Sequence, residues 1–203
     1  MRIYGDLRSG NCYKVKLILH LLDRPHEWVD VDVMAGATKQ PDFLAINPNG
    51  RVPVAQIPGK GVLTESNAIL NYIAMGTPYY PEDPWTRARI QQWQFFEQYT
   101  HEPSIAVNRF IMLFQNMPEW RQAEFEAKVT QGYHALDVME SALRKQPFLC
   151  GDTYTTADIA LYAYTHVAHE GGFDLGPYPS IIEWIDRIQF LPRHVTLDQA
   201  KSL

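Results

Sequence analysis

The chain has few cysteines and no long apolar run. Only two of its 203 residues are cysteines, and Cys12 and Cys150 match neither a disulfide framework nor a metal-ligand spacing. A reducing compartment therefore fits best, and no metal site is expected. No segment approaches the roughly 18 apolar residues that a membrane span requires, and the N-terminus lacks the apolar core of a signal peptide. We therefore expect a cytoplasmic protein that does not use a membrane.

Positive charge is also scarce. The 18 Lys and Arg residues are outnumbered by 23 Asp and Glu residues, which gives a formal net charge of −5. Because nucleic-acid binding relies on Lys and Arg to neutralise phosphates, this balance argues against a nucleic-acid partner. With 46% hydrophobic and 20% charged residues, the chain is predicted to fold and to bind small molecules or a second copy of itself.

The N-terminal part of the chain predicts a small α/β unit. Strand patterns occupy residues 2–5 and 27–33, and residues 12–22 between them suit a helix with a broad apolar face. A short helix over 41–46, two brief strands and a further helix follow. The order βαβ then αββα resembles a thioredoxin-like domain, in which the first two strands are parallel.

Helices alone are predicted for the second part of the chain. Three prolines within residues 76–84 indicate a linker. Beyond it we expect a long helix that bends near Pro103, followed by three others. The first of these three covers residues 118–143, the second begins at Thr155, and the third includes residues 181–188. The predicted domains are therefore 1–76 (α/β), a linker over 77–84, and 85–203 (all-α).

Thr155 and Asp158 stand at the start of one of these helices. A hydroxyl and a carboxylate three residues apart form a reciprocal cap, which satisfies backbone N–H groups that the helix leaves unpaired. We interpret this pair as structural. Removing Asp158 is expected to cost about 1 kcal/mol or more.

The most informative stretch runs from Phe43 to Ile73. Asn47-Pro48-Asn49-Gly50 predicts a turn, and Val52-Pro53-Val54 begins an apolar run. Pro53 cannot donate to a sheet ladder, so it suits a strand start or an edge. If its peptide bond is cis, Val52 turns its N–H and C=O outward and offers one donor and one acceptor to an extended peptide.

Thr64-Glu65-Ser66-Asn67 opens an amphipathic helix after the second brief strand. The backbone N–H groups at such a helix start bind carboxylates well. Together with Val52, this motif points to a short peptide that has a free carboxylate. Taken singly, Pro53 also suits an ordinary turn, and Glu65 with Ser66 an ordinary helix cap.

The order and spacing of VPV, two strands and TESNAI resemble the glutathione-binding half of the cytosolic glutathione transferases. This resemblance implies a thioredoxin-like domain followed by an all-helical domain. It implies that Val52, before a cis Pro53, pairs with the backbone of the glutathione cysteine. It also implies that Glu65 and Ser66 hold the γ-glutamyl end.

Two basic residues extend this expected site. Lys39 falls where related transferases place a basic residue for the glycine carboxylate of glutathione. Arg51 adjoins Val52 and is expected to contact the same ligand. A lysine at a helix start is otherwise a solvated charge.

Ser9-Gly10-Asn11-Cys12-Tyr13-Lys14-Val15 supplies hydroxyl and amide donors at a helix start, where a thiolate is stabilised. The motif resembles the serine-type transferases. This resemblance implies that Ser9 is catalytic and hydrogen-bonds the glutathione sulfur, with Asn11 as a further contact. Two alternatives remain. Ser9 also suits a plain N-cap, and alignment to cysteine-using bacterial classes moves the reactive position to Asn11.

Cys12 has two interpretations. A cysteine in the first turn of a helix can have a lowered pKa and form a mixed disulfide with glutathione. It can equally be a small buried side chain, which is the interpretation we favour.

The resemblance implies a detoxifying glutathione transferase that acts on small hydrophobic electrophiles as a homodimer. Glutathione would be a co-substrate, and neither a further cofactor nor a metal is expected. One alternative is a glutathione-dependent thiol–disulfide or peroxide reductase that relies on Cys12. Another is a binding or scaffold protein that keeps the fold without turnover.

Overall fold

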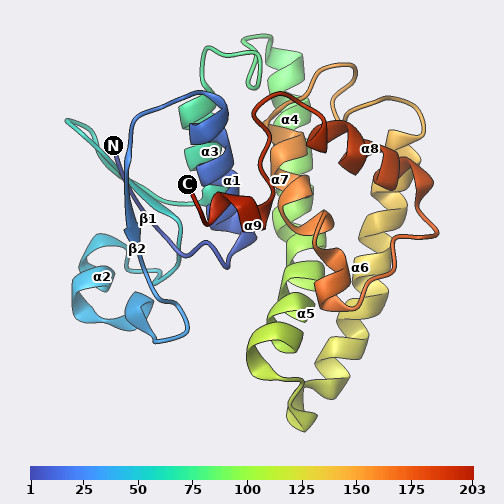
Figure 1. Ribbon diagram of the computed structural model, residues 1–203, viewed down its shortest axis with the longest axis horizontal. Coiled ribbons are helices and arrows are strands. Elements are labelled where there is room, and N and C mark those ends of the chain that lie inside the picture. Colours follow the sequence, from blue (N-terminus) through green and yellow to red (C-terminus); the bar gives the residue numbers. More distant parts are fainter. The chain divides into compact units, whose positions relative to one another are not determined.

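The computed structural model describes residues 1–203, and these form two compact units (Figure 1). The first unit comprises Met1–Met75 together with Pro192–Leu203, and the second comprises Gly76–Leu191. A mixed α/β unit and an all-helical unit are present, which confirms the predicted fold class.

The first unit contains a four-stranded sheet in the order β2-β1-β3-β4. β1 pairs with β2 in parallel, while β1 with β3 and β3 with β4 are antiparallel. The elements of this unit are β1 (Arg2–Gly5), α1 (Gly10–Leu21), β2 (Glu27–Asp30), α2 (Pro41–Ile46), β3 (Val54–Ile57), β4 (Gly61–Leu63), α3 (Ser66–Ala74) and α9 (Leu197–Ala200).

The strand register brings several chain segments to one end of this sheet. Tyr4, near the end of β1, lies opposite Val54, the first residue of β3. Leu63, the last residue of β4, lies opposite Ala55. The loop after β1, the segment before β3 and the start of α3 therefore share one end of the sheet. The loop after β2 joins them there, because β2 runs parallel to β1.

β2 is shorter than the sequence pattern predicts. The expected strand covered 27–33, but β2 ends at Asp30. Two residues later, the carboxylate of Asp32 accepts the backbone N–H groups of Met34 and Ala35 at 3.0 and 3.1 Å. Because this side chain binds the following backbone, the chain turns there instead of extending the ladder.

α1 is buried on almost every side. Ten of its twelve residues are buried, and two of these are lysines, Lys14 and Lys16. A helix in this position needs an apolar surface around most of its circumference, which the run from Val15 to Leu21 supplies.

The C-terminal residues pack on α1. The sequence placed 192–203 in the helical domain, whereas the structure groups them with the first unit. The hydroxyl of Tyr13 donates to the carbonyl of Val195 at 2.6 Å, and the guanidinium of Arg193 donates to the carbonyl of His20 at 2.8 Å. Contacts between residues this distant along the chain leave no periodic signal in the sequence.

The second unit is built from helices, and no strand forms in it, as predicted. Its helices are α4 (Pro84–Phe96), a π-helical turn (Glu97–His101), α5 (Glu102–Gln115), α6 (Gln122–Leu143), α7 (Thr156–Thr165) and α8 (Pro179–Gln189), with short 3-10 turns at Glu119–Arg121 and Ala168–Gly171.

The π-helical turn joins α4 to α5 close to the predicted bend. Pro103 lies in the first turn of α5, directly after this wider turn. A proline is tolerated in a first turn because its missing N–H has no partner to lose there. The predicted helix over 118–143 begins later, at Gln122, since a 3-10 turn precedes it.

Asp158 is the polar centre of the second unit. The reciprocal cap with Thr155 is present, as the sequence predicts. One carboxylate oxygen accepts the N–H and the hydroxyl of Thr155 at 2.9 and 3.1 Å. The other accepts the backbone N–H of Leu149 at 2.8 Å and the indole N–H of Trp184 at 3.0 Å. This fully buried side chain therefore ties the start of α7 to α8 and to the preceding loop.

We expect Asp158→Ala to lower the free energy of unfolding by about 2–5 kcal/mol, because it leaves buried N–H groups without acceptors. Urea unfolding followed by tryptophan fluorescence would measure the loss. Asp152→Ala is the matched control, since that aspartate is exposed. A loss below about 1 kcal/mol would mean that Asp158 acts only as a local helix cap.

Candidate functional site

Ser9 occupies the N-cap position of α1. Its backbone is extended, with φ −89° and ψ 125°, but its side chain makes no capping hydrogen bond. The hydroxyl instead hydrogen-bonds the sulfur of Cys12. Ser9 thus holds a hydroxyl donor beside the first turn of α1, where the helix's own ladder leaves backbone N–H groups unused. Ser9 is thus the N-cap residue by its backbone position, without a side-chain capping hydrogen bond.

Cys12 is a buried thiol. It has no exposed surface, and the backbone N–H of Asp6 donates to its sulfur at 3.3 Å. Burial raises the pKa of Cys12 to about 12, although the hydrogen bonds from Asp6 and Ser9 act in the opposite direction. The prediction of a small buried side chain is confirmed, and the thiol is un-ionised at neutral pH.

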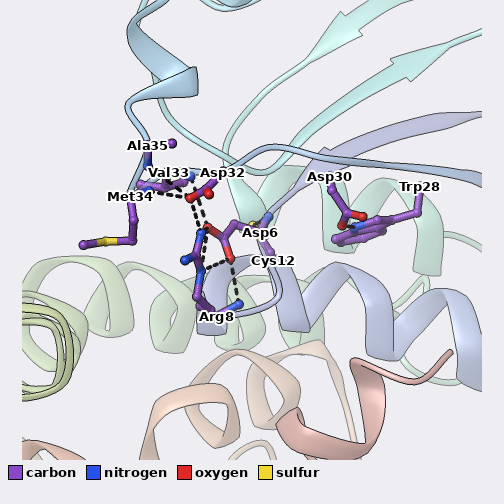
Figure 2. Close-up of polar contacts among 9 residues, drawn as sticks. All are labelled: Asp6, Arg8, Cys12, Trp28, Asp30, Asp32, Val33, Met34 and Ala35. Carbon is purple, nitrogen blue, oxygen red and sulfur yellow. Dashed lines mark hydrogen bonds and ion pairs between the residues drawn. The ribbon is translucent and has the colours of Figure 1, made fainter.

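The loop between β1 and α1 is clamped by three charged side chains (Figure 2). The carboxylate of Asp6 accepts the backbone N–H of Arg8 at 3.0 Å and that of Val33 at 3.2 Å. The guanidinium of Arg8 binds Asp6 at 2.6 Å and also reaches Asp32 at 2.5 Å. These contacts tie the loop after β1 to the loop after β2 and fix the residue that precedes Ser9.

The charge of Asp6 depends on this clamp. Burial acts to raise the pKa of Asp6, but the hydrogen bonds from Arg8 and from the backbone of Val33 outweigh it. The pKa of Asp6 therefore lies below its ordinary value. The ionised carboxylate is the form that the fold stabilises.

Val52 and Pro53 lie directly before β3. Their peptide bond is cis. Val52 lies outside the β1–β3 ladder, whose first β3 residue is Val54, and no backbone hydrogen bond within the protein uses its N–H or C=O. An extended ligand beside the sheet would therefore find one donor and one acceptor at Val52.

Lys39 lies against the turn before this segment. Its ammonium group donates to the carbonyl of Gly50 at 3.1 Å. Gly50 has a φ of 60°, and a Cβ atom there would lie 2.8 Å from the Lys39 nitrogen and 3.0 Å from the carbonyl oxygen of Thr38. Glycine is thus required for this contact. Arg51 follows with an exposed side chain.

Glu65 and Ser66 begin α3. Glu65 is the N-cap residue and has a φ of 66°, which is uncommon for a residue other than glycine. Such conformations gather at ligand sites, so this one supports a functional role. Ser66 is buried, and its hydroxyl donates to the amide oxygen of Asn11 at 3.1 Å. The starts of α1 and α3, predicted separately, are therefore in contact.

Lys14 contacts both Asn11 and Ser66, and the sequence analysis did not identify it as a site residue. Its ammonium lies 2.7 Å from the amide oxygen of Asn11, 3.4 Å from the Ser66 hydroxyl and 3.5 Å from the amide oxygen of Asn67. The sequence does place a lysine three residues after Asn11 on a helix otherwise rich in apolar residues, a spacing that brings the two side chains together.

Two polar side chains of α5 form hydrogen bonds within the second unit. The hydroxyl of Ser104 donates to the carbonyl of Thr100, and the amide of Asn108 donates to the carbonyl of Phe125.

No group of three His, Cys, Asp or Glu side chains is arranged to hold a metal ion. None of the helices has the length and apolar character needed to cross a membrane.

A thioredoxin-like domain with a site at one end of its sheet, followed by an all-helical domain, describes the class of this protein. The family model of the glutathione S-transferase N-terminal domain matches residues 1–75, and that of the C-terminal domain matches residues 104–192. The chain belongs to the glutathione S-transferase family.

The chain is similar to glutathione S-transferases of known structure and to one protein with an oxidoreductase name. A glutathione S-transferase structure from Pseudomonas fluorescens Pf-5 is 55% identical, covers 97% of this chain and 98% of its own, and has a TM-score of 0.94. A theta-class transferase from Xanthomonas axonopodis pv. citri, solved with glutathione bound, is 28% identical, with a TM-score of 0.84 and coverage of 95% and 93%. The disulfide-bond oxidoreductase YfcG of Escherichia coli is 29% identical, with coverage of 91% and 88%.

We expect Asp6→Asn to destabilise the protein at neutral pH, by an amount that shrinks as the pH falls. The pKa of Asp6 is lowered in the folded state. Its contribution is thus present above the unfolded pKa of about 3.9 and disappears as the pH falls through the lower folded pKa. Urea unfolding of wild type and variant between pH 7 and about pH 3 would measure this difference.

Glu27→Gln serves as the control for this experiment. It breaks an exposed ion pair with Arg2 at the opposite end of the same sheet and should cost at most about 1 kcal/mol. A stability difference for Asp6→Asn that stays constant across this pH range would contradict the charged clamp.

Proposed function

We propose that the protein is a glutathione transferase that joins the glutathione thiolate to small apolar electrophiles. The observation that carries this proposal is the contact between the starts of α1 and α3, made by Ser66 and Asn11. This contact lies at the end of the sheet where Val52 leaves its backbone groups available. The glutathione bound to the theta-class relative supports the same ligand class here.

The proposed ligand contacts follow the chemistry of each segment. Glu65, Ser66 and the start of α3 hold the γ-glutamyl end, since helix N–H groups and a hydroxyl suit its carboxylate. Val52, before Pro53, pairs with the backbone of the glutathione cysteine. Lys39 and Arg51 attract the glycine carboxylate. The Lys39 ammonium, held by Gly50, is fixed beside this segment.

Ser9 is the proposed catalytic residue. Its hydroxyl turns from the Cys12 sulfur to the glutathione sulfur and donates a hydrogen bond, which favours the thiolate over the thiol. The dipoles of the Asn11 amide and of the start of α1 also stabilise the negative charge of the thiolate. The thiolate then attacks an electrophilic carbon and forms a C–S bond. A leaving group departs with its electron pair, or, in an addition, the adjacent atom takes a proton from water.

A glutathione-dependent reductase is the second candidate, because one relative is named a disulfide-bond oxidoreductase. The form of this candidate that relies on Cys12 is not favoured, since that thiol has no exposed surface and a raised pKa. A reductase would have to use the thiol of glutathione itself. The scaffold alternative predicts that glutathione binds without acidification of its thiol.

A homodimer in the cytoplasm, with a role in detoxification, completes the proposal. Support for association comes from large aromatic side chains exposed on α4 and the π-helical turn. Trp85, Phe95 and Tyr99 are 72%, 71% and 90% exposed. Aromatic side chains are enriched at protein interfaces.

We expect the thiol of bound glutathione to ionise below its free pKa, and Ser9→Ala to reverse most of this shift. A charge-assisted hydrogen bond contributes about 1.5–3 kcal/mol, which corresponds to roughly one to two pKa units. Ultraviolet difference titration of thiolate absorbance against pH would measure both proteins. The same variant should lower kcat/KM by roughly ten- to a hundredfold.

Ser9→Thr is the matched control, because it keeps the hydroxyl and should retain most of the acidification. If glutathione binds to the wild type but its thiol is not acidified, the transferase proposal fails. The scaffold or reductase alternatives then take its place.

We expect Cys12→Ala to keep the transferase rate within about twofold. The thiol is buried and un-ionised, so its removal costs stability, on the order of 1 kcal/mol, and leaves the chemistry in place. Steady-state kinetics with a chromogenic electrophile, beside a disulfide-reduction assay, would test this expectation. Loss of disulfide reduction in Cys12→Ala would restore the redox interpretation of this residue.

A further inference from the structure

Lys14 is a buried charge at the centre of the candidate site. Its side chain has no exposed surface, although lysine is almost never fully buried unless it is paired. Removing an ammonium group from water costs several kcal/mol, and hydrogen bonds must offset this cost. Where a fold keeps such a group, a role beyond stability is a reasonable hypothesis, and its contacts indicate which one.

The contacts of Lys14 fall on residues of the proposed glutathione site. Its ammonium is closest to the amide oxygen of Asn11, at 2.7 Å. The same oxygen accepts the hydroxyl of Ser66, and Lys14 also reaches Ser66 and Asn67 at 3.4 and 3.5 Å. One ammonium thus contacts the first turn of α1 and the first turn of α3 together.

This geometry determines which way the Asn11 amide faces. Two donors lie at its oxygen, and the amide nitrogen is therefore on the opposite side of the group, as a donor. The positive charge also lies beside Ser66, at a helix start that already favours anions.

We propose that Lys14 is a positioning residue of the glutathione site, which orients Asn11 and Ser66 and places a positive charge near the γ-glutamyl carboxylate. This inference rests on the proposed function. Through Lys14, α1 would then contribute to glutathione binding, in addition to the role of the Ser9 hydroxyl. It also explains why the fold retains a buried charge between two helices.

Lys14→Met is the test, because methionine has a similar length and no charge. Glutathione affinity should fall about tenfold, the effect of losing one charge-assisted interaction. The thermal midpoint should change little, since the partners of Lys14 are neutral groups and the substitution leaves no buried charge unpaired. Isothermal titration with glutathione and a thermal melt of the same sample would measure both quantities.

Rescue by a variant that keeps the charge provides a readout that a purely structural role would not change. Lys14→Arg keeps the charge and the donors, and its affinity should lie between those of the wild type and Lys14→Met.

Lys16→Met is the matched control. Lys16 is also buried in α1, but its ammonium lies over the ring of Trp28, 5.2 Å from the ring centre. This control removes the same charge from the same helix, and its glutathione affinity should stay within about twofold of the wild type. A tenfold loss there would overturn the role of the Lys14 contacts and leave only a general effect of charge.

The outcomes separate this inference from the proposed function. If the wild type does not bind glutathione, both fail. If the wild type binds and Lys14→Met binds equally well, only the role of Lys14 is overturned. If Lys14→Met loses stability in step with affinity, or does not fold, Lys14 is a structural link between two helices and the inference is wrong.

Discussion

The antiparallel pairing of β1 with β3 is the constraint on which the site depends. With Tyr4 opposite Val54, the segment before β3 must lie at the end of the sheet where β1 leads into α1. The pairing of β3 with β4 then returns the chain to the same end, and α3 begins there. A shift of this register by one residue would turn every β3 side chain to the opposite face.

Charged groups inside the protein hold distant segments together. In the first unit, Asp6 and Arg8 connect the loops after β1 and β2, while Lys14 connects two helix starts. In the second unit, Asp158 connects α7 to α8. Each group meets several partners at once, which is the condition under which a buried polar group supports a unique fold. Substitution of Asp6 or Asp158 is therefore expected to lower stability, whereas substitution of Lys14 is expected to act on glutathione binding.

The burial of Cys12 decides which thiol is available for chemistry. Its desolvation raises the pKa to about 12 and leaves no thiolate at neutral pH. Ser9, whose hydroxyl forms a hydrogen bond with that sulfur, is half-buried at the start of α1. Under the proposed function, a thiol brought by the ligand is therefore the one that this loop would activate.

Local patterns in the amino-acid sequence determined much of this protein by themselves. Alternation and helical periodicity predicted the α/β unit and the helices after it. The turn and cap chemistry of VPV and TESN predicted two ligand-binding segments. Only the tertiary structure decided that the strand at 27–33 ends early, that residues 192–203 pack on α1, and that Lys14 meets Ser66. These features depend on contacts between residues far apart along the chain, and such contacts have no period that a sequence can display.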